Sequence, residues 1–180
     1  MGFESVVLRN YLTVDVEFAV VEGFSSIVLE TDETEKEIGT IRLNIYNSRL
    51  TDLCDTADGI SGSQYYLISN ATKHLPSLEL NKKLLTIEEI NIDSNYRSKG
   101  HGNAALNELL KLAKILSVDY IVLKPAPPND EASDDKTVRN SQIKRLINFY
   151  ERFGFQTYTV AKDEPIMALD TEGIEYYDIP

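Results

Sequence analysis

The 180-residue sequence has a single cysteine, Cys54, and no long hydrophobic run. A lone cysteine excludes a framework of disulfides within the chain and a cysteine-based metal site. A membrane-spanning helix needs about 20 consecutive apolar residues, and the first residues, MGFESVVLRN, lack the basic and apolar regions of a secretory signal. We therefore expect a cytoplasmic protein that does not engage a membrane.

Basic residues are also scarce. The 18 lysines and arginines face 29 aspartates and glutamates, which gives a net charge of −11. Proteins that bind nucleic acids normally show a basic surface, so we expect no nucleic-acid partner. Such acidity suits a cationic small molecule or a basic peptide, and it is equally well explained by solubility.

Histidine occurs twice, as His74 and His101. Neither lies near a serine and a carboxylate in a pattern typical of a hydrolase triad. His101 occupies a variable position of a glycine-bearing turn, where we expect it to be exposed and non-catalytic. The acidic residues of segment 125–138 resemble metal ligands in composition only, because the prolines there predict a solvated loop. We therefore expect no metal site.

The first half of the chain is predicted to be rich in strands. Apolar and polar residues alternate in several segments, and Asp58-Gly59 indicates a loop before an amphipathic segment that ends at Pro76. The expected strands are 12–21, 25–30 and 38–46, and the expected helix is 64–75.

The second half shows a strand, a turn, a helix and another strand. Residues 103–116 carry one wide apolar helical face, and residues 119–124 form a nearly continuous apolar strand of the kind buried on both faces. A right-handed crossover makes strands 84–92 and 119–124 parallel. A helix near 139–152 and strands near 155–160 and 166–170 follow.

These segments predict one domain over residues 1–180. The fold class is α/β (α+β), with a mixed central sheet flanked by helices.

The segment from Arg97 to Gly102, which reads RSKGHG, has the composition of an anion-binding turn. It precedes a helix whose first N–H groups and dipole favour negative charge. Gly100 and Gly102 allow a diphosphate to approach the backbone, and Arg97 and Lys99 add positive charge. The spacing is not that of a Walker loop, and a two-glycine turn is equally often a structural cap. Ala105 keeps a dinucleotide-binding interpretation open, although the rest of the chain does not repeat the strand–helix–strand unit.

Two motifs resemble those of the GNAT superfamily of N-acetyltransferases. The run from Ile87 to Gly102, IEEINIDSNYRSKGHG, is similar to motif A, in which a strand is followed by a glycine-bearing turn and a long helix. Residues 148–155, NFYERFGF, are similar to motif B, a helix that ends in Y-x-x-x-G-F. The resemblance is clearest over residues 84–170 and implies an acetyl-CoA-dependent acyltransferase.

The resemblance also implies how acetyl-CoA is held. Backbone groups of the strand end would pair with the pantetheine arm, as an added strand does, and backbone N–H groups of the turn would bind the pyrophosphate. The strand residues are Ile90, Asn91 and Ile92, and the turn residues are Arg97, Ser98, Lys99, Gly100, His101, Gly102 and Asn103.

Three residues match positions of catalytic groups in the family. Tyr150 matches a tyrosine near the sulfur of CoA, where a phenol protonates the leaving thiolate. An acceptor amine must lose a proton before it attacks, and Glu88 and Glu89 stand where several family members carry a carboxylate base. Glu88 is the preferred base, with Glu89 or a water molecule as alternatives.

Several points stay open. The acceptor amine is a small molecule or a protein amine, and members of the family are often homodimers, with strands 155–160 and 166–170 as the expected site of pairing. The two helices that usually follow the first strand of the family are not found. A non-catalytic CoA-binding module is the main rival function, and a Rossmann-type nucleotide-binding protein is the second.

Overall fold

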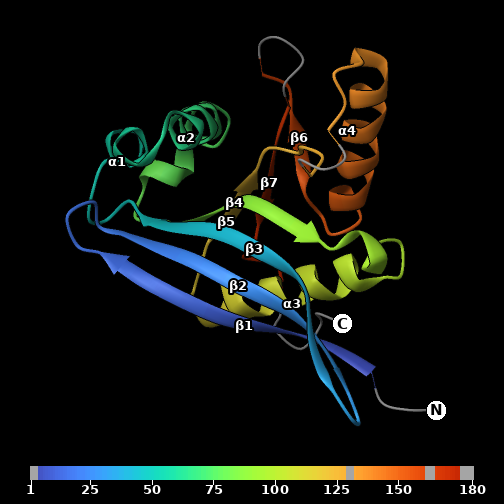
Figure 1. Ribbon diagram of the computed structural model, residues 1–180. Coiled ribbons are helices and arrows are strands. Elements are labelled where there is room, and N and C mark those ends of the chain that lie inside the picture. The colour runs from blue at the N-terminus through green and yellow to red at the C-terminus, as the bar shows by residue number, and fades with distance from the viewer. Residues whose placement is uncertain (1–3, 129–131, 161–164, 175–180) are drawn as a thin grey trace.

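A seven-stranded mixed sheet forms the centre of the computed structural model, which describes residues 4–128, 132–160 and 165–174 (Figure 1). The strands are β1 (Glu4–Asp15), β2 (Val20–Thr31), β3 (Glu35–Asn47), β4 (Lys83–Ile92), β5 (Tyr120–Leu123), β6 (Gln156–Tyr158) and β7 (Ile166–Asp170). The helices are α1 (Leu53–Ile60), α2 (Gly62–His74), α3 (His101–Ile115) and α4 (Lys136–Glu151), with two short 3-10 turns at Pro76–Glu79 and Ser94–Tyr96.

The strand order in the sheet is β1-β2-β3-β4-β5-β7-β6. Strands β1 to β4 form an antiparallel meander, β4 and β5 are parallel, and β7 pairs antiparallel with both β5 and β6. Helix α3 is the crossover between the two parallel strands. The expected α/β class, mixed sheet and parallel pair are therefore confirmed.

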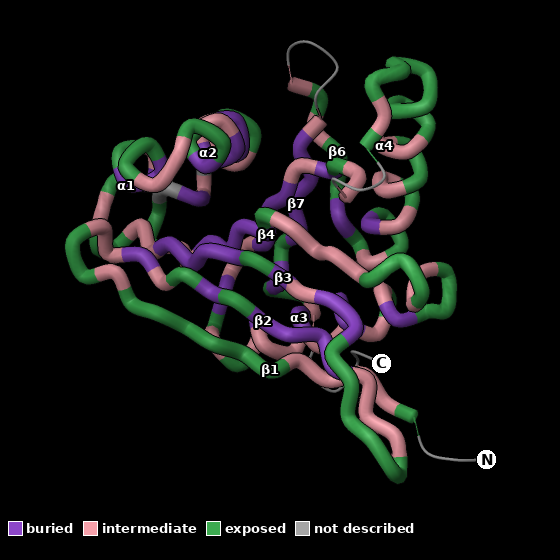
Figure 2. Tube along the Cα trace, in the orientation of Figure 1, coloured by how far each residue is buried: buried purple, intermediate pink, exposed green. Residues whose placement is uncertain are grey.

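Each face of the sheet carries its own hydrophobic cluster. Helices α1 and α2 cover one face, and α3 covers the opposite face (Figure 1). On strand β4, Leu85 and Ile87 pack on the α3 side while Leu84 packs on the α1–α2 side. Both faces are covered there, which is why the middle of the strand is apolar without alternation. Burial is concentrated on the central strands, whereas β1 is exposed or half-buried along its length (Figure 2).

The predicted strand 12–21 is wrong. The chain turns back between Asp15 and Val20, and the two arms pair as β1 and β2. The Asp15 side chain accepts a hydrogen bond from the backbone N–H of Phe18, and Ala19 takes a positive φ of 52°. The turn therefore uses an aspartate rather than glycine or proline. Because neither glycine nor proline interrupts the segment, the apolar residues before and after the turn look like one continuous strand.

The predicted loop at Asp58-Gly59 is also wrong, because both residues lie inside α1. A Cβ atom at position 59 would lie 2.5 Å from the Phe18 ring, so the glycine accommodates packing rather than a turn. Helix 64–75 is confirmed as α2 with slightly different bounds. Helices α1 and α2 follow the third strand, not the first, which explains why they were not found in the expected place.

In the part of the chain that is described, no helix is long and apolar enough to cross a membrane. The same residues contain no group of three or more histidine, cysteine or acidic side chains placed to hold a metal ion. Part of the predicted acidic loop, residues 129–131, lies outside the described residues.

Candidate active site

The sheet opens where β4 outlasts its parallel neighbour. Strand β5 ends at Leu123, opposite Ile87, while β4 continues to Ile92 and pairs only with β3 on its other side. A cavity of about 240 Å³ lies at this opening, and its walls include Glu88, Glu89, Leu123 and Tyr150. The opening thus leaves one backbone edge of β4 available to a ligand.

Glu88 is the bulged residue of β4. In the β3–β4 register Arg42 faces Glu89 and Leu43 faces Ile87, so Glu88 has no partner on β3. A bulge redirects a side chain and disrupts the local ladder. Here it presents the Glu88 carboxylate at the cavity.

Two buried amides hold the Glu88 carboxylate. Its Oε1 accepts hydrogen bonds from Asn44 Nδ2 at 2.9 Å and from Gln64 Nε2 at 2.9 Å. Asn44 and Gln64 are only 4% and 2% exposed. Among the described residues no donor contacts Glu88 Oε2, so one carboxylate oxygen is fixed while the other can accept a proton.

A buried network behind these amides fixes their orientation. Tyr46 and Thr86 both donate to Gln64 Oε1, at 3.0 and 2.9 Å, so the amide nitrogen of Gln64 must point at Glu88. Burial raises the pKa of Tyr46, and the negative charges of Glu88 and Glu22 add to the shift. Tyr46 therefore stays a neutral donor.

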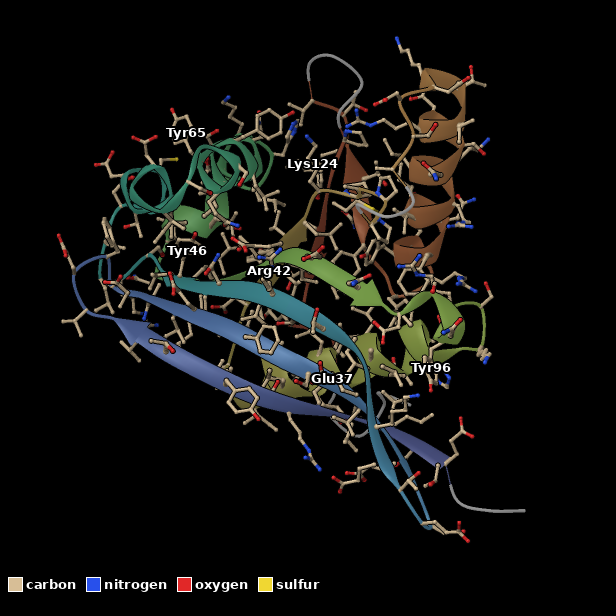
Figure 3. All side chains as sticks on the ribbon, in the orientation of Figure 1. Glu37, Arg42, Tyr46, Tyr65, Tyr96 and Lys124 are labelled. Atoms are coloured by element: carbon tan, nitrogen blue, oxygen red, sulfur yellow. The ribbon has the colours of Figure 1, made fainter. Side chains whose placement is uncertain are left out.

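Glu89 is engaged in a different way. Its Oε2 accepts two hydrogen bonds from Arg42, from Nη2 at 2.6 Å and from Nε at 3.2 Å. The hydrogen bond and the charge of Glu89 raise the pKa of Arg42. Figure 3 shows Arg42 and Tyr46 along β3, on the side of the sheet that faces α1 and α2. The structure therefore separates two neighbouring glutamates, one held by neutral amides and one paired with a cation.

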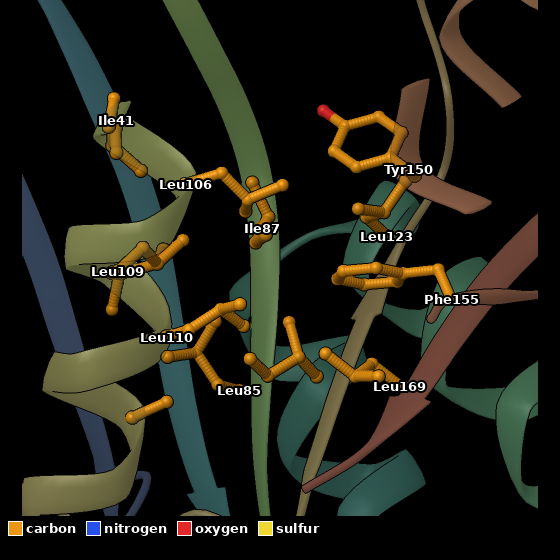
Figure 4. Close-up of a cluster of buried hydrophobic side chains, with 14 of the residues drawn as sticks. Ile41, Leu85, Ile87, Leu106, Leu109, Leu110, Leu123, Tyr150, Phe155 and Leu169 are labelled. Carbon is orange, nitrogen blue, oxygen red and sulfur yellow. The ribbon is translucent and has the colours of Figure 1, made fainter. Parts of the chain in front are cut away.

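Tyr150 forms another wall of the cavity. It lies near the C-terminal end of α4, and its side chain is 8% exposed. Its ring packs against Phe149 and Phe155, with centroids 5.0 and 5.5 Å away. Burial raises the pKa of its phenol to about 12. The hydroxyl points away from Phe155 toward the β4 side of the opening (Figure 4).

The glycine-bearing turn leads from β4 into α3. Side-chain caps from Asp52, Ser61 and Asp135 close the N-termini of α1, α2 and α4, whereas α3 begins after Gly100 without a side-chain cap. Gly100 has a φ of 88°, a conformation that favours glycine. In the described part of the chain, the backbone N–H groups of residues 98–102 have no hydrogen-bond acceptor. Five consecutive donors at a helix N-terminus suit an anion.

The side chains of this turn support it from behind. Arg97 donates from Nε to the carbonyl oxygen of Ile92 at 2.6 Å and from Nη2 to Asn91 Oδ1 at 3.1 Å, so it ties the turn to the end of β4. The expectation that His101 is exposed is wrong, because it is 7% exposed and its ring lies 6.1 Å from that of Tyr96. Its place one helical turn before the buried Ala105 directs it inward.

A basic groove lies beside the turn on α4. Its walls include Lys144, Arg145, Phe149 and Arg152. A Cβ atom at Gly102 would lie 3.9 Å from Cζ of Phe149, so the groove adjoins the first turn of α3. Within a chain of net charge −11, this groove concentrates positive charge next to the uncapped helix.

A sheet that opens beside a bulge, an uncapped helix after it and a buried tyrosine on α4 occur together here. The sequence profile of the acetyltransferase (GNAT) family matches residues 13–155, most of the chain. The chain belongs to the GNAT acetyltransferase family. The resemblance of the two motifs to this family is therefore confirmed.

The chain is similar to several solved structures. A tyrosine-to-phenylalanine variant of KacT is 12% identical, with a TM-score of 0.50 over 87% of this chain and 75% of that chain. A chain from a KacTA–DNA complex is 12% identical, with a TM-score of 0.49 over 87% of this chain and 72% of that chain. The PaiA N-acetyltransferase of Thermoplasma acidophilum, in complex with coenzyme A, is 16% identical, with a TM-score of 0.45 over 82% and 59%. A search of curated proteins finds no match.

The three expected catalytic residues, Tyr150, Glu88 and Glu89, line the same cavity. Ile90 also lies in its wall. Asn91 and Ile92 continue along the same strand edge toward the turn of residues 97–103. Sequence reasoning missed Asn44 and Gln64, which orient Glu88. No local signal identifies them, because both contacts depend on the register of the sheet and the docking of α2.

Proposed function

We propose that this GNAT protein transfers the acetyl group of acetyl-CoA directly to an acceptor amine in a ternary complex. The observation that carries the proposal is that Glu88 and Tyr150 line the same cavity at the opening between β4 and β5. A proton acceptor and a proton donor thereby face one space, as acyl transfer to an amine requires.

The residues present fit acetyl-CoA. The N–H groups of residues 98–102 and the dipole of α3 match a pyrophosphate. A Cβ atom at Gly102 would meet only Phe149, at 3.9 Å, so the fold itself does not require glycine there, whereas a closely approaching ligand would. The exposed edge of β4 from Glu88 to Asn91 offers backbone groups to an extended arm. When bound, acetyl-CoA supplies an activated acyl group and a thiolate leaving group.

Glu88 is assigned the role of base. An alkylamine with a pKa near 10 is protonated at neutral pH and has no lone pair with which to attack. The Oε2 atom of Glu88 accepts that proton, directly or through water, while Asn44 and Gln64 hold Oε1 in place. Glu89 is the less suitable base because Arg42 occupies one of its oxygens twice.

Tyr150 is assigned the role of acid. Burial keeps its phenol protonated at neutral pH, since its pKa lies at about 12. As the new C–N bond forms and the C–S bond breaks, the phenol gives its proton to the departing sulfur. The nitrogen loses its second proton to solvent as the amide forms. Solvent restores the phenol proton and takes up the proton held by Glu88, so one proton is released overall.

The acceptor is a small molecule or a protein amine. The expectation that nucleic acid is not a partner rests on the net charge of −11 and stays a prediction. The cytoplasmic location and the homodimer also stay predictions. Strand β6 is an edge of the sheet, whereas β7 lies between β5 and β6, so only β6 of the two proposed strands has a free edge within the described sheet.

Calorimetric titration with acetyl-CoA, and in parallel with NADH, tests the proposal. We expect saturable binding of acetyl-CoA alone, followed by release of free thiol when a panel of amines is added. Acetyl-CoA binding without thiol release on any amine would favour a non-catalytic CoA-binding module. Binding of NADH in place of acetyl-CoA would favour a Rossmann-type nucleotide-binding protein.

A further inference from the structure

A second cavity lies on the face of the sheet that also carries Tyr46, next to the end of α1. It has a volume of about 330 Å³, and its walls include Tyr11, Glu22, Phe24, Arg42, Asn44 and Glu88. Arg42 and Glu88 also line the cavity of Tyr150. The two cavities therefore meet at Glu88, the proposed base.

Oxygen acceptors form a row across three strands in this second cavity. Glu22 on β2 faces Asn44 on β3, and Asn44 donates to Glu88 on β4. Asn44 is 4% exposed, and among the described residues no donor contacts its Oδ1. Glu22 likewise has no hydrogen-bond or ion-pair partner among the described residues. Three acceptors thus face a ligand that can donate hydrogen bonds.

The net charge of this surface is negative. Arg42 is the cation in its wall, and the hydrogen bonds from its Nη2 and Nε to Glu89 neutralise it. Among the described residues Glu22 and Glu88 form no ion pair, although the charge of Glu88 adds to the raised pKa of Arg42. Both charges raise the pKa of Tyr46, so both lie within electrostatic reach of the same hydroxyl.

Aromatic rings adjoin this row. Tyr11 on β1 faces Phe24 on β2, with ring centroids 6.4 Å apart, and the two side chains are 61% and 42% exposed. Exposed rings beside carboxylates favour an alkylammonium ligand, because the ring faces attract its charge and its methylene groups pack on them.

We propose that the second cavity selects an acceptor amine that carries a second positive charge. The amine to be acetylated lies at Glu88, and the distal ammonium lies at Glu22 and Phe24. Glu22 and Glu88 stand on strands two spacings apart, roughly 9.6 Å, which suits a flexible linear diamine. This inference rests on the proposed function, because it assigns the acceptor of the same site.

A matched pair of amines tests the inference. Cadaverine and n-pentylamine have the same carbon chain and differ in the second ammonium group. At low salt we expect kcat/KM to favour cadaverine by about tenfold or more, since a hydrogen bond to a charged group is commonly that strong. Added salt should reduce this preference, because screening weakens an accessible ion pair.

The variants Glu22→Gln and Glu30→Gln locate the effect. Glu30 lies on the same strand near the other end of β2, opposite Glu35, and does not line the cavity. Glu22→Gln should raise KM for cadaverine and bring the kcat/KM values of the two amines within about twofold of each other. Glu30→Gln should keep the preference.

Three results would overturn the inference: equal kcat/KM for the two amines, an unchanged preference in Glu22→Gln, or transfer to neither amine. The proposed function is judged separately. Acetylation of n-pentylamine without a preference for cadaverine leaves it standing, whereas failure of acetyl-CoA to bind refutes it.

Discussion

At the scale of single residues, Tyr150 carries a buried ring and a hydroxyl that borders the β4–β5 cavity. Replacing it with phenylalanine keeps the ring contacts and removes only the proton donor. We expect Tyr150→Phe to lower kcat by roughly tenfold to a thousandfold, within reach of the usual contribution of an acid–base group. Calorimetry should give an unchanged affinity for acetyl-CoA. An unaffected turnover rate would assign Tyr150 a structural role.

The same residue gives a prediction about alkaline stability. Burial raises the pKa of Tyr150 from 10.0 to about 12, so between these pH values the folded protein keeps a proton that the unfolded chain has lost. The stabilisation is complete below pH 10 and disappears as the pH rises toward 12, a change of up to roughly 3 kcal/mol. Urea unfolding of the protein and of Tyr150→Phe at increasing alkaline pH should show a shallower decline for the variant. If the unfolding free energy fell equally steeply with pH in both proteins, the prediction would be contradicted.

Glu88 and Glu89 differ in their partners, which makes them a matched pair for mutation. Glu88→Gln should lower the rate about a hundredfold at neutral pH, a typical effect of losing a general base. The deficit should shrink as the pH approaches about 10, where the free amine no longer needs a base. Glu89→Gln removes the ion pair with Arg42 and should change the rate only a little. The assignment would be reversed if Glu89→Gln lowered the rate more than Glu88→Gln did, and if the deficit of Glu88→Gln did not change with pH.

At the scale of elements, the start of α3 depends on glycine for two separate reasons. Gly100 needs its positive φ of 88°, whereas a Cβ atom would fit at Gly102. We expect Gly102→Val to weaken acetyl-CoA binding at least tenfold, because its branches stand in front of the N–H donors, with a change in unfolding free energy below about 1 kcal/mol. Gly62→Val, at the start of α2, is the control, since a Cβ atom there meets nothing within 4 Å. Equal affinities in both variants would remove the turn from the binding site.

Elements with a strong periodic pattern could be predicted from the sequence. The strand at 84–92 and the helix at 103–116 were placed within two residues, because apolar residues on β4 and α3 repeat with the period of their contacts. Helix α1 was missed because the space for a side chain at Gly59 is taken by Phe18, a contact between distant parts of the chain. The glycine itself looks like a turn residue.

The candidate site was predictable to a similar extent. Tyr150, Glu88 and the glycine turn were found through motifs, which are local in the sequence. Glu88 stands out from Glu89 only in the folded protein, because the bulge and the amides of Asn44 and Gln64 depend on strand register and on the docking of α2. The second cavity depends on strand register as well, since Glu22 on β2 faces Asn44 on the neighbouring strand β3.

At the scale of the whole molecule, one hydrophobic cluster joins both halves of the sheet. On the face covered by α3 it contains residues from either side of the β4–β5 opening: Ile27 and Ile41 from the meander, Leu123 and Leu169 from the C-terminal strands, and Leu109 from α3 (Figure 4). The opening that holds the site therefore interrupts the backbone ladder but not the core. This continuity predicts that the chain unfolds as a single domain.

Leu109→Ala tests that continuity. Leu109 is fully buried, so we expect its truncation to lower the free energy of unfolding by about 2–5 kcal/mol, the cost of lost contacts and a residual cavity. The chain has no tryptophan, so far-UV circular dichroism and tyrosine fluorescence are the two probes. In a single domain both should report one coincident urea transition, shifted together in the variant. If one probe shifted and the other did not, the two halves of the sheet would fold independently, and the β4–β5 opening would be a boundary between units rather than a gap held open by a shared core.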